Sequence, residues 1–342
     1  MKPFLPAAST TSLPPIGGRL GPEPRHFVVE EIPAYLPSGA GPHVYVWLEK
    51  TGHNTADVAR ALARAAGVRE SDVGYAGMKD KNAVTRQWLS VPESPRAVDS
   101  WDLPPGVRIL ESSRHGNKLR TGHLHGNRFV LTLIDVPDGG MERATALIAF
   151  LREHGVPNYY GSQRFGREGN NLADALAWLA DGASRGGGGR GRFAQKMWPS
   201  VIQAEIFNRY LAQRRSAPEA LWAGEVVRLE GTGRHFVVED AERELPRLLA
   251  RDLHPTGALV GPKTLQAGGR ARELEESIFG ELGLDAERLE RLGRVAPGAR
   301  RDLLLHPAEL RVSAPGPGEL ELAFELPAGG YATQVLRELL QN

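Results

Sequence analysis

The sequence predicts an α+β protein whose outer domain is built from both ends of the chain and carries a more helical insertion. Its 342 residues are enough for two domains of ordinary size, each with its own core. Segments in which apolar and polar residues alternate, as they do in strands, lie near both ends. Helical patterns and glycine-rich segments are concentrated between them, and this order favours a discontinuous outer domain.

The first part of the chain contains most of the clear strands. Residues 1–18 are rich in proline and predict a loose tail. Asn54 or Thr55 is expected to cap a helix that Gly67 ends. Strands are predicted at 26–32, 43–50, 71–77, 85–91 and 128–136, and helices at 54–67 and 141–154.

Beyond Gly155 the composition changes. The segment "VPNYYGSQRFGREGNN" predicts a long loop, and "SRGGGGRGRF" is the most flexible stretch by composition. A hairpin is expected to turn at Gly231–Gly233. Helices are predicted at 172–182, 200–214, 271–283 and 331–341, and a last strand at 319–327.

Composition excludes several classes of protein. The chain contains no cysteine, which excludes disulfides and thiolate metal sites, and a cytoplasmic location fits this composition. No apolar run reaches the roughly 20 residues of a membrane helix, and the N-terminus lacks the pattern of a secretory signal.

The net charge of +1 hides a segregation of charge. Five Lys or Arg and one acid lie between Arg108 and Arg128, whereas seven acids and one Arg lie between Glu273 and Glu290. The basic sector can bind a polyanion locally, or both segments can be solvated faces of opposite sign. Charge alone favours neither interpretation.

One acid, Asp80, lies in the basic, glycine-led loop "GYAGMKDKNAVTRQW". An aspartate is ionised at neutral pH, so it can serve as a nucleophile, a base or an electrostatic stabiliser. The local pattern by itself is more typical of a turn or helix-capping aspartate. Elsewhere there is no phosphate-binding Lys-Ser/Thr motif, and "HLH" at His123 and His125 lacks a third metal ligand.

Aromatic residues in loops or at strand ends accompany the arginine-rich segments. Exposed rings and cations are the two features that single-stranded RNA requires, because rings stack on unpaired bases and cations bind phosphates. Each ring can equally be part of an ordinary core. The aromatic residues in question are Phe27, Tyr75, Tyr159, Tyr160, Phe165 and Tyr331.

The motifs "GYAGMKDKNAVTRQW", "GNRFVLTL", "GVPNYYGSQRFG", "NNL" and "LPAGGYATQVLREL", in this order, resemble the TruD family of tRNA pseudouridine synthases. The resemblance covers the chain from about Gly17 to its end. It implies a mixed, mainly antiparallel sheet with flanking helices, formed by residues 1–155 and 304–342. It also implies a family-specific α+β insertion at 156–303. The implied activity is the conversion of a uridine in tRNA, position 13 in bacterial members, to pseudouridine without a cofactor or a metal.

The resemblance also implies roles for individual residues. Asp80 matches the catalytic aspartate, and Phe27 matches the motif phenylalanine near the N-terminus. Asn127 and Phe129 match a "GN-x-F" motif that lies against the target base. Tyr331 stands where family members commonly carry phenylalanine, so it keeps a ring that can stack and adds a hydroxyl.

A second departure from the family concerns a cation. Gly21 stands where a lysine is usual, and Arg25 and His26 replace an acidic pair. Arg19, two residues before Gly21 and so on the same strand face, is the candidate that replaces the lysine charge beside Asp80. Lys79, which precedes Asp80, is a second candidate.

The expected partner is tRNA, bound by a monomer. Insertion arginines in loops with glycine neighbours are expected to bind phosphates rather than base edges. A tRNA-binding or tRNA-folding protein without catalysis is the alternative function, and an acidic hydrolase is a weaker one because no second carboxylate is evident. The RNA-contact candidates are Arg164, Arg167, Arg120 and Lys118, with Arg185, Arg190 and Arg192 in the insertion.

Overall fold

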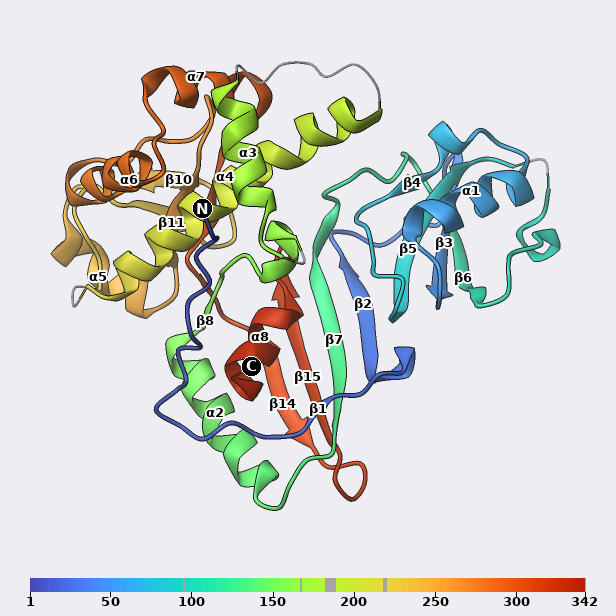
Figure 1. Cartoon of the computed structure of the whole chain (residues 1–342). Coiled ribbons are helices and arrows are strands. Elements are labelled where there is room, and N and C mark those ends of the chain that lie inside the picture. Colours follow the sequence, from blue (N-terminus) through green and yellow to red (C-terminus); the bar gives the residue numbers. More distant parts are fainter. Residues whose placement is uncertain (95, 167, 182–188, 218–219, 342) are drawn as a thin grey trace. The chain divides into compact units, whose positions relative to one another are not determined.

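The structure of the chain is a computed structural model that describes residues 1–94, 96–166, 168–181, 189–217 and 220–341 (Figure 1). It divides into two compact units. The sheet unit comprises Thr10–Gly155 and His306–Asn342, and the insertion unit comprises Met1–Ser9 and Val156–Leu305. The insertion expected at 156–303 and the continuous part of the insertion unit differ by two residues at one end.

The first nine residues are the main difference from the expected division, because they pack with the insertion unit rather than with the outer domain. The backbone N–H of Phe4 donates to the carboxylate of Glu205 at 3.0 Å. The amide of Asn208 donates to the carbonyl of Phe4 at 3.4 Å. A buried carboxylate therefore satisfies the backbone of the tail, a contact that proline content alone could not reveal.

A nine-stranded sheet organises the sheet unit, in the order β14-β15-β7-β2-β5-β3-β6, with β1 paired to β7 and β4 to β5. The β2·β5 pair is parallel and the other pairs are antiparallel, which confirms the expected mixed, mainly antiparallel sheet. The strands are β1 Arg19–Leu20, β2 Phe27–Pro33, β3 His43–Lys50, β4 Gly74–Tyr75, β5 Val84–Pro92, β6 Val107–His115, β7 Leu124–Ile134, β14 Ala308–Ser313 and β15 Leu320–Pro327.

Among the described residues of this unit, three α-helices accompany the sheet: α1 (Thr55–Ala66), α2 (Gly140–His154) and α8 (Ala332–Leu340) (Figure 1). Helix α1 follows Asn54 and ends at Gly67, whose φ of 71° is the left-handed conformation that glycine adopts easily. Its Val58 and Leu62 belong to one core cluster with the inward residues of β3. The helix predicted at 54–67 is therefore confirmed, and it buries Val58 and Leu62 with β3.

The opposite face of the sheet carries an unbroken row of alternating charges across six strands. In strand order the row is Glu325, Arg128, Glu30, Arg86, Glu49 and Arg108, and each residue is the register partner of the next. The five successive ion-pair distances are 2.7, 3.6, 3.1, 2.9 and 3.0 Å. Because opposite charges face each other at every step, this charge row favours the observed register over its neighbours.

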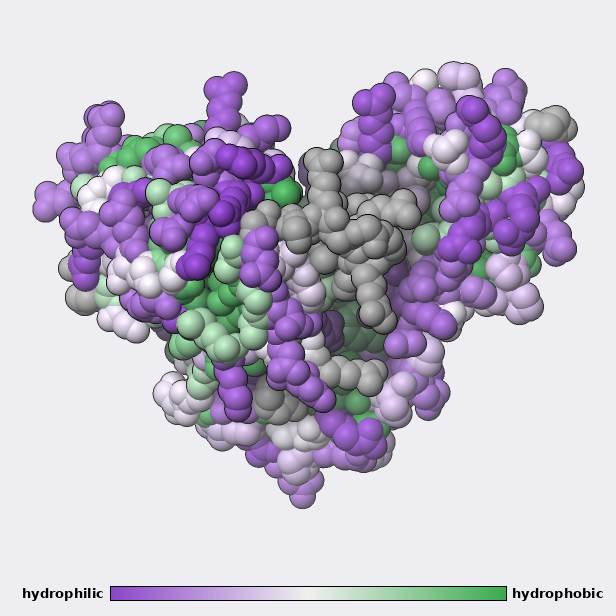
Figure 2. Space-filling view, turned by 45° about the horizontal axis from the view of Figure 1, so that its top comes forward, coloured by the Kyte–Doolittle hydropathy of each residue, from purple (hydrophilic) through white to green (hydrophobic). Residues whose placement is uncertain are grey.

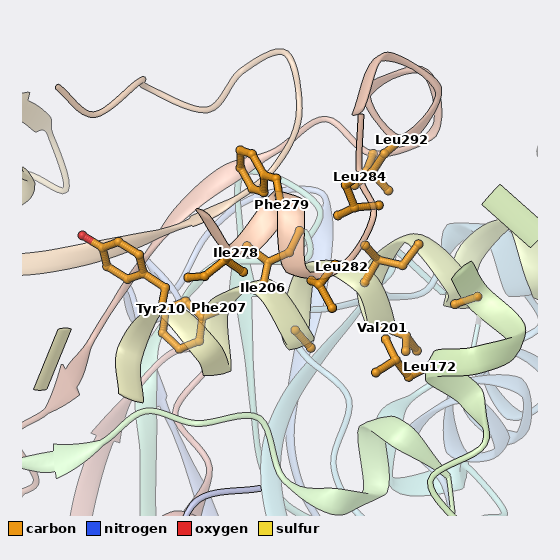
Figure 3. Close-up of a cluster of buried hydrophobic side chains, with 14 of the residues drawn as sticks. Leu172, Val201, Ile206, Phe207, Tyr210, Ile278, Phe279, Leu282, Leu284 and Leu292 are labelled. Atoms are coloured by element: carbon orange, nitrogen blue, oxygen red, sulfur yellow. The ribbon is translucent and has the colours of Figure 1, made fainter. Parts of the chain in front are cut away.

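The insertion unit has a helical core around α4 (Figure 3). Leu172 of α3, Phe207 of α4 and Ile278 of α6 are fully buried in this core. Its sheets have the order β10-β9-β11-β12 and β13-β8. Its elements are β8 Val156–Pro157, α3 Asn171–Ala180, α4 Gly189–Arg215, β9 Val226–Leu229, β10 His235–Val237, α5 Ala241–Leu249, β11 Leu253–Leu259, α6 Gly269–Glu281, α7 Ala286–Val295, β12 Ala299–Asp302 and β13 Leu304–Leu305.

Helix α4 corrects one prediction, because it begins at Gly189 rather than at Ser200. Arg190 and Arg192 therefore lie in a helix and not in a flexible loop. Arg167 and Arg185 lie outside the described residues. Glycine content led to the wrong prediction, since a helix with Pro199 in its interior and glycines at its start depends on tertiary packing rather than on propensity.

Hydrophilic residues cover most of the face shown in Figure 2, and hydrophobic residues appear there in small areas. The large apolar side chains that are most exposed include Leu36, Met78 and Leu249. Within the described part of the chain, no helix combines the length and the apolar character needed to cross a membrane.

We expect Glu49→Gln to lower the free energy of unfolding by about 1 kcal/mol at neutral pH, because it removes two ion pairs of the charge row. Although burial opposes the shift, Arg86 and Arg108 lower the pKa of Glu49. A lowered carboxyl pKa contributes stability above the unfolded-state value, and this contribution is lost as pH falls through the folded-state value. The difference between wild type and variant, measured by urea unfolding, should therefore shrink in acid.

Glu321→Gln is the matched control, since Glu321 lies on β15 and has no ion pair among the described residues. Glu321→Gln should change the free energy of unfolding by less than about 0.3 kcal/mol. Equal effects of the two variants, or an unchanged difference in acid, would refute a role for the charge row.

Candidate active site

The loop between β4 and β5 presents Asp80 at the protein surface. One carboxylate oxygen, Oδ1, accepts the backbone N–H of Asn82 at 2.9 Å. This is the turn contact that the local sequence favours, and it coexists with exposure of the side chain. The described residues place no hydrogen-bond donor on the other oxygen, Oδ2, and the residue as a whole is exposed.

Two loops are joined beneath Asp80. Lys50, the last residue of β3, is fully buried. Its ammonium donates to the backbone carbonyls of His53 at 2.8 Å, Asp80 at 2.8 Å and Lys79 at 3.4 Å. The N–H of Gly52 adds a bond to the carbonyl of Lys81 at 3.1 Å. The turn after β3 and the Asp80 loop are therefore fixed to each other.

Neutral polar side chains form a second set of anchors. The backbone N–H of Lys79 donates to Oγ1 of Thr55 at 2.9 Å, and that hydroxyl donates to Oε1 of Gln87 at 2.9 Å. Nε2 of Gln87 donates to the carbonyl of Gly77 at 3.0 Å. Thr55 and Gln87 are both fully buried, so these bonds are made away from water and leaving one unmade would be costly.

A buried ion pair forms the third anchor. Nζ of Lys79 lies 2.9 Å from Oε2 of Glu31, and both side chains are almost completely shielded from solvent. Oε1 of Glu31 accepts the backbone N–H of Trp88 at 3.3 Å. The pair ties the residue before Asp80 to β2, the strand at the centre of the sheet.

Burial changes the proton affinity of these groups. Burial lowers the pKa of Lys50 to about 8; the nearby Asp80 charge opposes this shift and Lys79 adds to it. Burial also raises the pKa of Glu31, against the attraction of Lys79. The two ammonium groups therefore differ: Lys79 has a carboxylate partner, whereas Lys50 has backbone carbonyls.

The predicted base-binding residues lie on β2 and β7, with Tyr331 at the start of α8. Phe129 is 6% exposed. Its ring stacks on Phe324 at 5.4 Å and meets the edge of Phe27 at 6.3 Å. This burial assigns Phe129 to the core behind the site and not to an open stacking platform. Phe27 is half-buried, and Tyr331 is 38% exposed.

Asn127 has an unusual environment. Its Oδ1 is buried and has no hydrogen-bond partner among the described residues. Asn127 is the register partner of Glu31. Glu31 follows the charge-row residue Glu30 on β2, so these two side chains point to opposite faces of the sheet. Asn127 and Glu31 therefore face the side of the sheet from which the Asp80 loop is anchored. A buried acceptor without a partner is unfavourable, so this oxygen could gain from a bound N–H group.

The two cations predicted to support Asp80, Arg19 and Lys79, each pair with another carboxylate in the structure. Arg19 donates from Nε to Asp135 at 2.8 Å in a largely exposed ion pair. Lys79 is neutralised by Glu31. Gly21 cannot carry a side chain without displacement, because a Cβ there would lie 2.2 Å from Nδ1 of His26. The buried ammonium that contacts Asp80 itself belongs to Lys50, and we retain neither Arg19 nor Lys79 as the supporting charge.

The basic sector is less basic than its sequence indicates. Arg108, Arg114 and Arg128 each pair with a glutamate from another strand or loop. Lys118 donates to the carbonyl of Ser71 at 2.6 Å, and Arg120 is exposed. The sector is therefore largely neutralised by acids that are distant in sequence.

Other candidates have local roles. Arg164, in the insertion unit, donates to Ser200 at 3.2 Å and lies over the ring of Tyr160. Nδ1 of His123 lies 2.7 Å from the hydroxyl of Tyr35. Among the described residues no group of three or more His, Asp or Glu could hold a metal ion.

Sequence reasoning missed four residues of the site: Glu31, Lys50, Thr55 and Gln87. Their signal was weak, because each is a polar residue at a position that faces inward. Gln87 interrupts the apolar face of β5, and Lys50 follows Val44, Val46 and Leu48 on the inward face of β3. A buried polar residue needs a partner, but sequence does not say which one.

Lys79→Met should lower the free energy of unfolding by about 3–5 kcal/mol, because it leaves the Glu31 carboxylate buried without its ion-pair partner. Adding Glu31→Leu should restore most of this loss, since the pair is then replaced by apolar side chains. Urea unfolding of the two variants measures both effects. A single variant as stable as wild type would show that the ion pair does not hold the loop.

Comparison with known proteins identifies relatives along the whole chain. The family model for tRNA pseudouridine synthase D (TruD) matches residues 7–173 and 192–339. The tRNA pseudouridine synthase D of an Anaeromyxobacter species is 43% identical over 97% of this chain and 95% of its own length. That of a Thermus thermophilus strain is 41% identical over 99% of this chain and 92% of its own.

A solved structure has the same fold. The crystal structure of the putative tRNA pseudouridine synthase D from Methanosarcina mazei matches with a TM-score of 0.72 at 23% sequence identity. The match covers 99% of this chain and 96% of the other. Together with the family model and the relatives at more than 40% identity, it confirms the resemblance: the chain belongs to the TruD family of tRNA pseudouridine synthases.

Proposed function

We propose that the protein converts a uridine of tRNA, at position 13, to pseudouridine, and that Asp80 is its catalytic carboxylate. The observation that carries this proposal is an exposed carboxylate on an irregular loop that buried polar and charged side chains hold in place. The substrate, a tRNA uridine, is inferred from the family, whose members are named tRNA pseudouridine synthases.

The chemistry requires little besides the carboxylate and a closed site. The C1′–N1 glycosidic bond breaks, the uracil turns, and a C1′–C5 bond forms, so atoms and electrons balance without a cofactor. The uridine must first leave the helix stack, which costs a few kcal/mol. Asp80 then acts on the sugar or the base of the extruded nucleotide, and its Asn82 contact sets the direction of the carboxylate.

Three side chains are proposed to hold the base. Oδ1 of Asn127 accepts an N–H of the uracil, which would satisfy an acceptor that lacks a partner among the described residues. The rings of Phe27 and Tyr331 are accessible for stacking, worth about 1–3 kcal/mol per base. Phe129 supports Phe27 from the core.

Binding of tRNA is proposed to depend on phosphate contacts outside this pocket. Arg120 and Lys118 in the sheet unit and Arg164 in the insertion unit are the described candidates. Contacts of this kind fix position and orientation but carry no base information. The enzyme is proposed to act as a cytoplasmic monomer.

Asp80→Asn should abolish pseudouridine formation and leave tRNA affinity within about threefold of wild type, because the substitution removes only the charge of the carboxylate. Tritium release from a [5-³H]uridine-labelled tRNA transcript measures turnover, and filter binding measures affinity. Turnover close to wild type would remove Asp80 from the mechanism. Wild-type protein that binds tRNA without releasing tritium would favour the alternative, a non-catalytic tRNA-binding protein.

Asn127→Leu should lower turnover by about tenfold or more while stability stays equal or rises. The reason is that Oδ1 has no partner to lose among the described residues, so an apolar residue of similar shape is tolerated there. Thermal unfolding and the tritium assay on one preparation separate the two effects. A loss of stability that parallels the loss of turnover would instead indicate a structural role for Asn127.

A further inference from the structure

Lys50 occupies a position that packing alone would give to an apolar residue. It continues the inward-facing series Val44, Val46 and Leu48, whose members belong to the core cluster under α1. Its side chain is fully buried, and the described residues place no carboxylate within ion-pair distance of Nζ. An ammonium buried in this way costs stability relative to a methionine or leucine of similar volume. Stability alone therefore does not explain this residue.

The contacts of Lys50 converge on the Asp80 loop. An ammonium has three protons, and the structure provides three acceptors: the carbonyls of His53, Lys79 and Asp80. With its own carbonyl held by Lys50 and its Oδ1 held by the N–H of Asn82, Asp80 is restrained at both its backbone and its side chain.

Charge gives Lys50 a second role. Among the charged groups around it, Lys79 is neutralised by Glu31, whereas Asp80 is the acidic residue whose backbone carbonyl accepts from the Lys50 ammonium at 2.8 Å. When a tRNA phosphate backbone approaches, a carboxylate in the site is repelled by it. A buried cation held at the backbone of Asp80 offsets that repulsion and is screened less than a surface lysine would be.

We propose that Lys50 is a positioning residue for catalysis, which fixes the backbone of the Asp80 loop and supplies a buried positive charge at the backbone of Asp80. This inference rests on the proposed function, in which Asp80 is the catalytic group. Lys50 touches neither the tRNA nor the reacting atoms in this arrangement. Its effect should therefore appear in the rate of the chemical step and not in tRNA affinity.

The test is Lys50→Met in the full chain, with an unmodified tRNA transcript as substrate. The single-turnover rate at saturating enzyme should fall by about 100-fold or more, as expected when a reacting group is misplaced by about an ångström. The dissociation constant for tRNA should stay within about threefold. The melting temperature near neutral pH should change little, because removal of a costly buried charge offsets the loss of its hydrogen bonds to three backbone carbonyls.

Lys81→Met is the matched control. It removes the positive charge of the residue that follows Asp80 in sequence. The Lys81 side chain is exposed, and the contact of this residue with the turn after β3 is made by its backbone carbonyl, which accepts the N–H of Gly52. Its single-turnover rate should stay within about threefold of wild type. A loss as large as that of Lys50→Met would mean that overall charge, rather than the buried ammonium, sets the rate, and would overturn the proposal.

A pH series provides a readout that a purely structural role would not change. The groups facing Lys50 are Asp80, Lys79 with its partner Glu31, and His53, which contributes a carbonyl. The wild-type rate should decline as pH rises through about 8, where Lys50 loses its proton, and the residual rate of Lys50→Met should lack this decline. The same decline in both proteins would contradict the assignment.

Stability against pH tests the buried charge without any activity measurement. A lysine pKa lowered from 10.5 to about 8 means that the unfolded chain binds more protons between these values. Wild type should therefore gain stability relative to Lys50→Met as pH rises through that window. A constant difference between the two proteins would show that the ammonium is not buried as proposed.

The outcomes separate this inference from the proposed function. An active Asp80→Asn protein refutes the proposed function itself. An inactive Asp80→Asn with a folded Lys50→Met whose rate is within about tenfold of wild type refutes only the role of Lys50. If Lys50→Met does not fold, Lys50→Gln is the second variant, because glutamine keeps N–H donors but carries no charge. A single-turnover rate about tenfold or more below wild type supports the proposal, and an unchanged rate overturns it.

Discussion

The burial of two ammonium groups under one irregular loop is the constraint on which the candidate site depends. A loop without regular backbone pairing must find other partners for its backbone groups. Here the inward-facing ends of Lys50, Thr55 and Gln87 provide them, and Lys79 adds an ion pair to β2. The loop is irregular in conformation but anchored at almost every residue from Gly77 to Lys81.

Successive side chains of β2 point to opposite faces of the sheet, and the ion pairs on the two faces differ in burial and in role. Glu31 faces inward and holds the loop through a single buried partner. Glu30, its neighbour in sequence, faces the other way and belongs to a row of six alternating charges. Buried pairs are costly and geometrically demanding, whereas partly exposed ones mainly disfavour wrong registers. Two adjacent glutamates therefore have different roles, which follow from the side on which each one lies.

Local patterns predicted the elements whose signal is local. The amphipathic stretch at 54–67 became α1 with its Gly67 terminus, and the alternating segment at 319–327 became β15. The strand β6 was missed because its sequence "VRILESSRH" was considered only as part of a basic sector. Its arginines pair with Glu49 and Glu93, which come from other parts of the chain. A charge count along the sequence cannot include partners that only folding brings together.

Separation in sequence also explains why the motif identified Asp80 but not the residues that hold its loop. A motif records residue types close together in sequence, whereas Glu31 and Lys79 are 48 positions apart and meet only across the sheet. The expected cation, Arg19, was chosen for its proximity in sequence to Gly21, yet its charge is matched by Asp135. Lys50 was not chosen because its position follows the apolar pattern of β3.

Two energetic exceptions accompany the motif at the candidate site. Lys50 is a buried charge held by carbonyls, and Oδ1 of Asn127 is a buried acceptor without a partner among the described residues. A buried charge and a buried acceptor without a partner both cost free energy, and both side chains lie on the inward side of the sheet, from which the Asp80 loop is anchored. Natural sequences tend to depart from the most stable choice where function requires it. The convergence of these departures on one face supports placing the chemistry there.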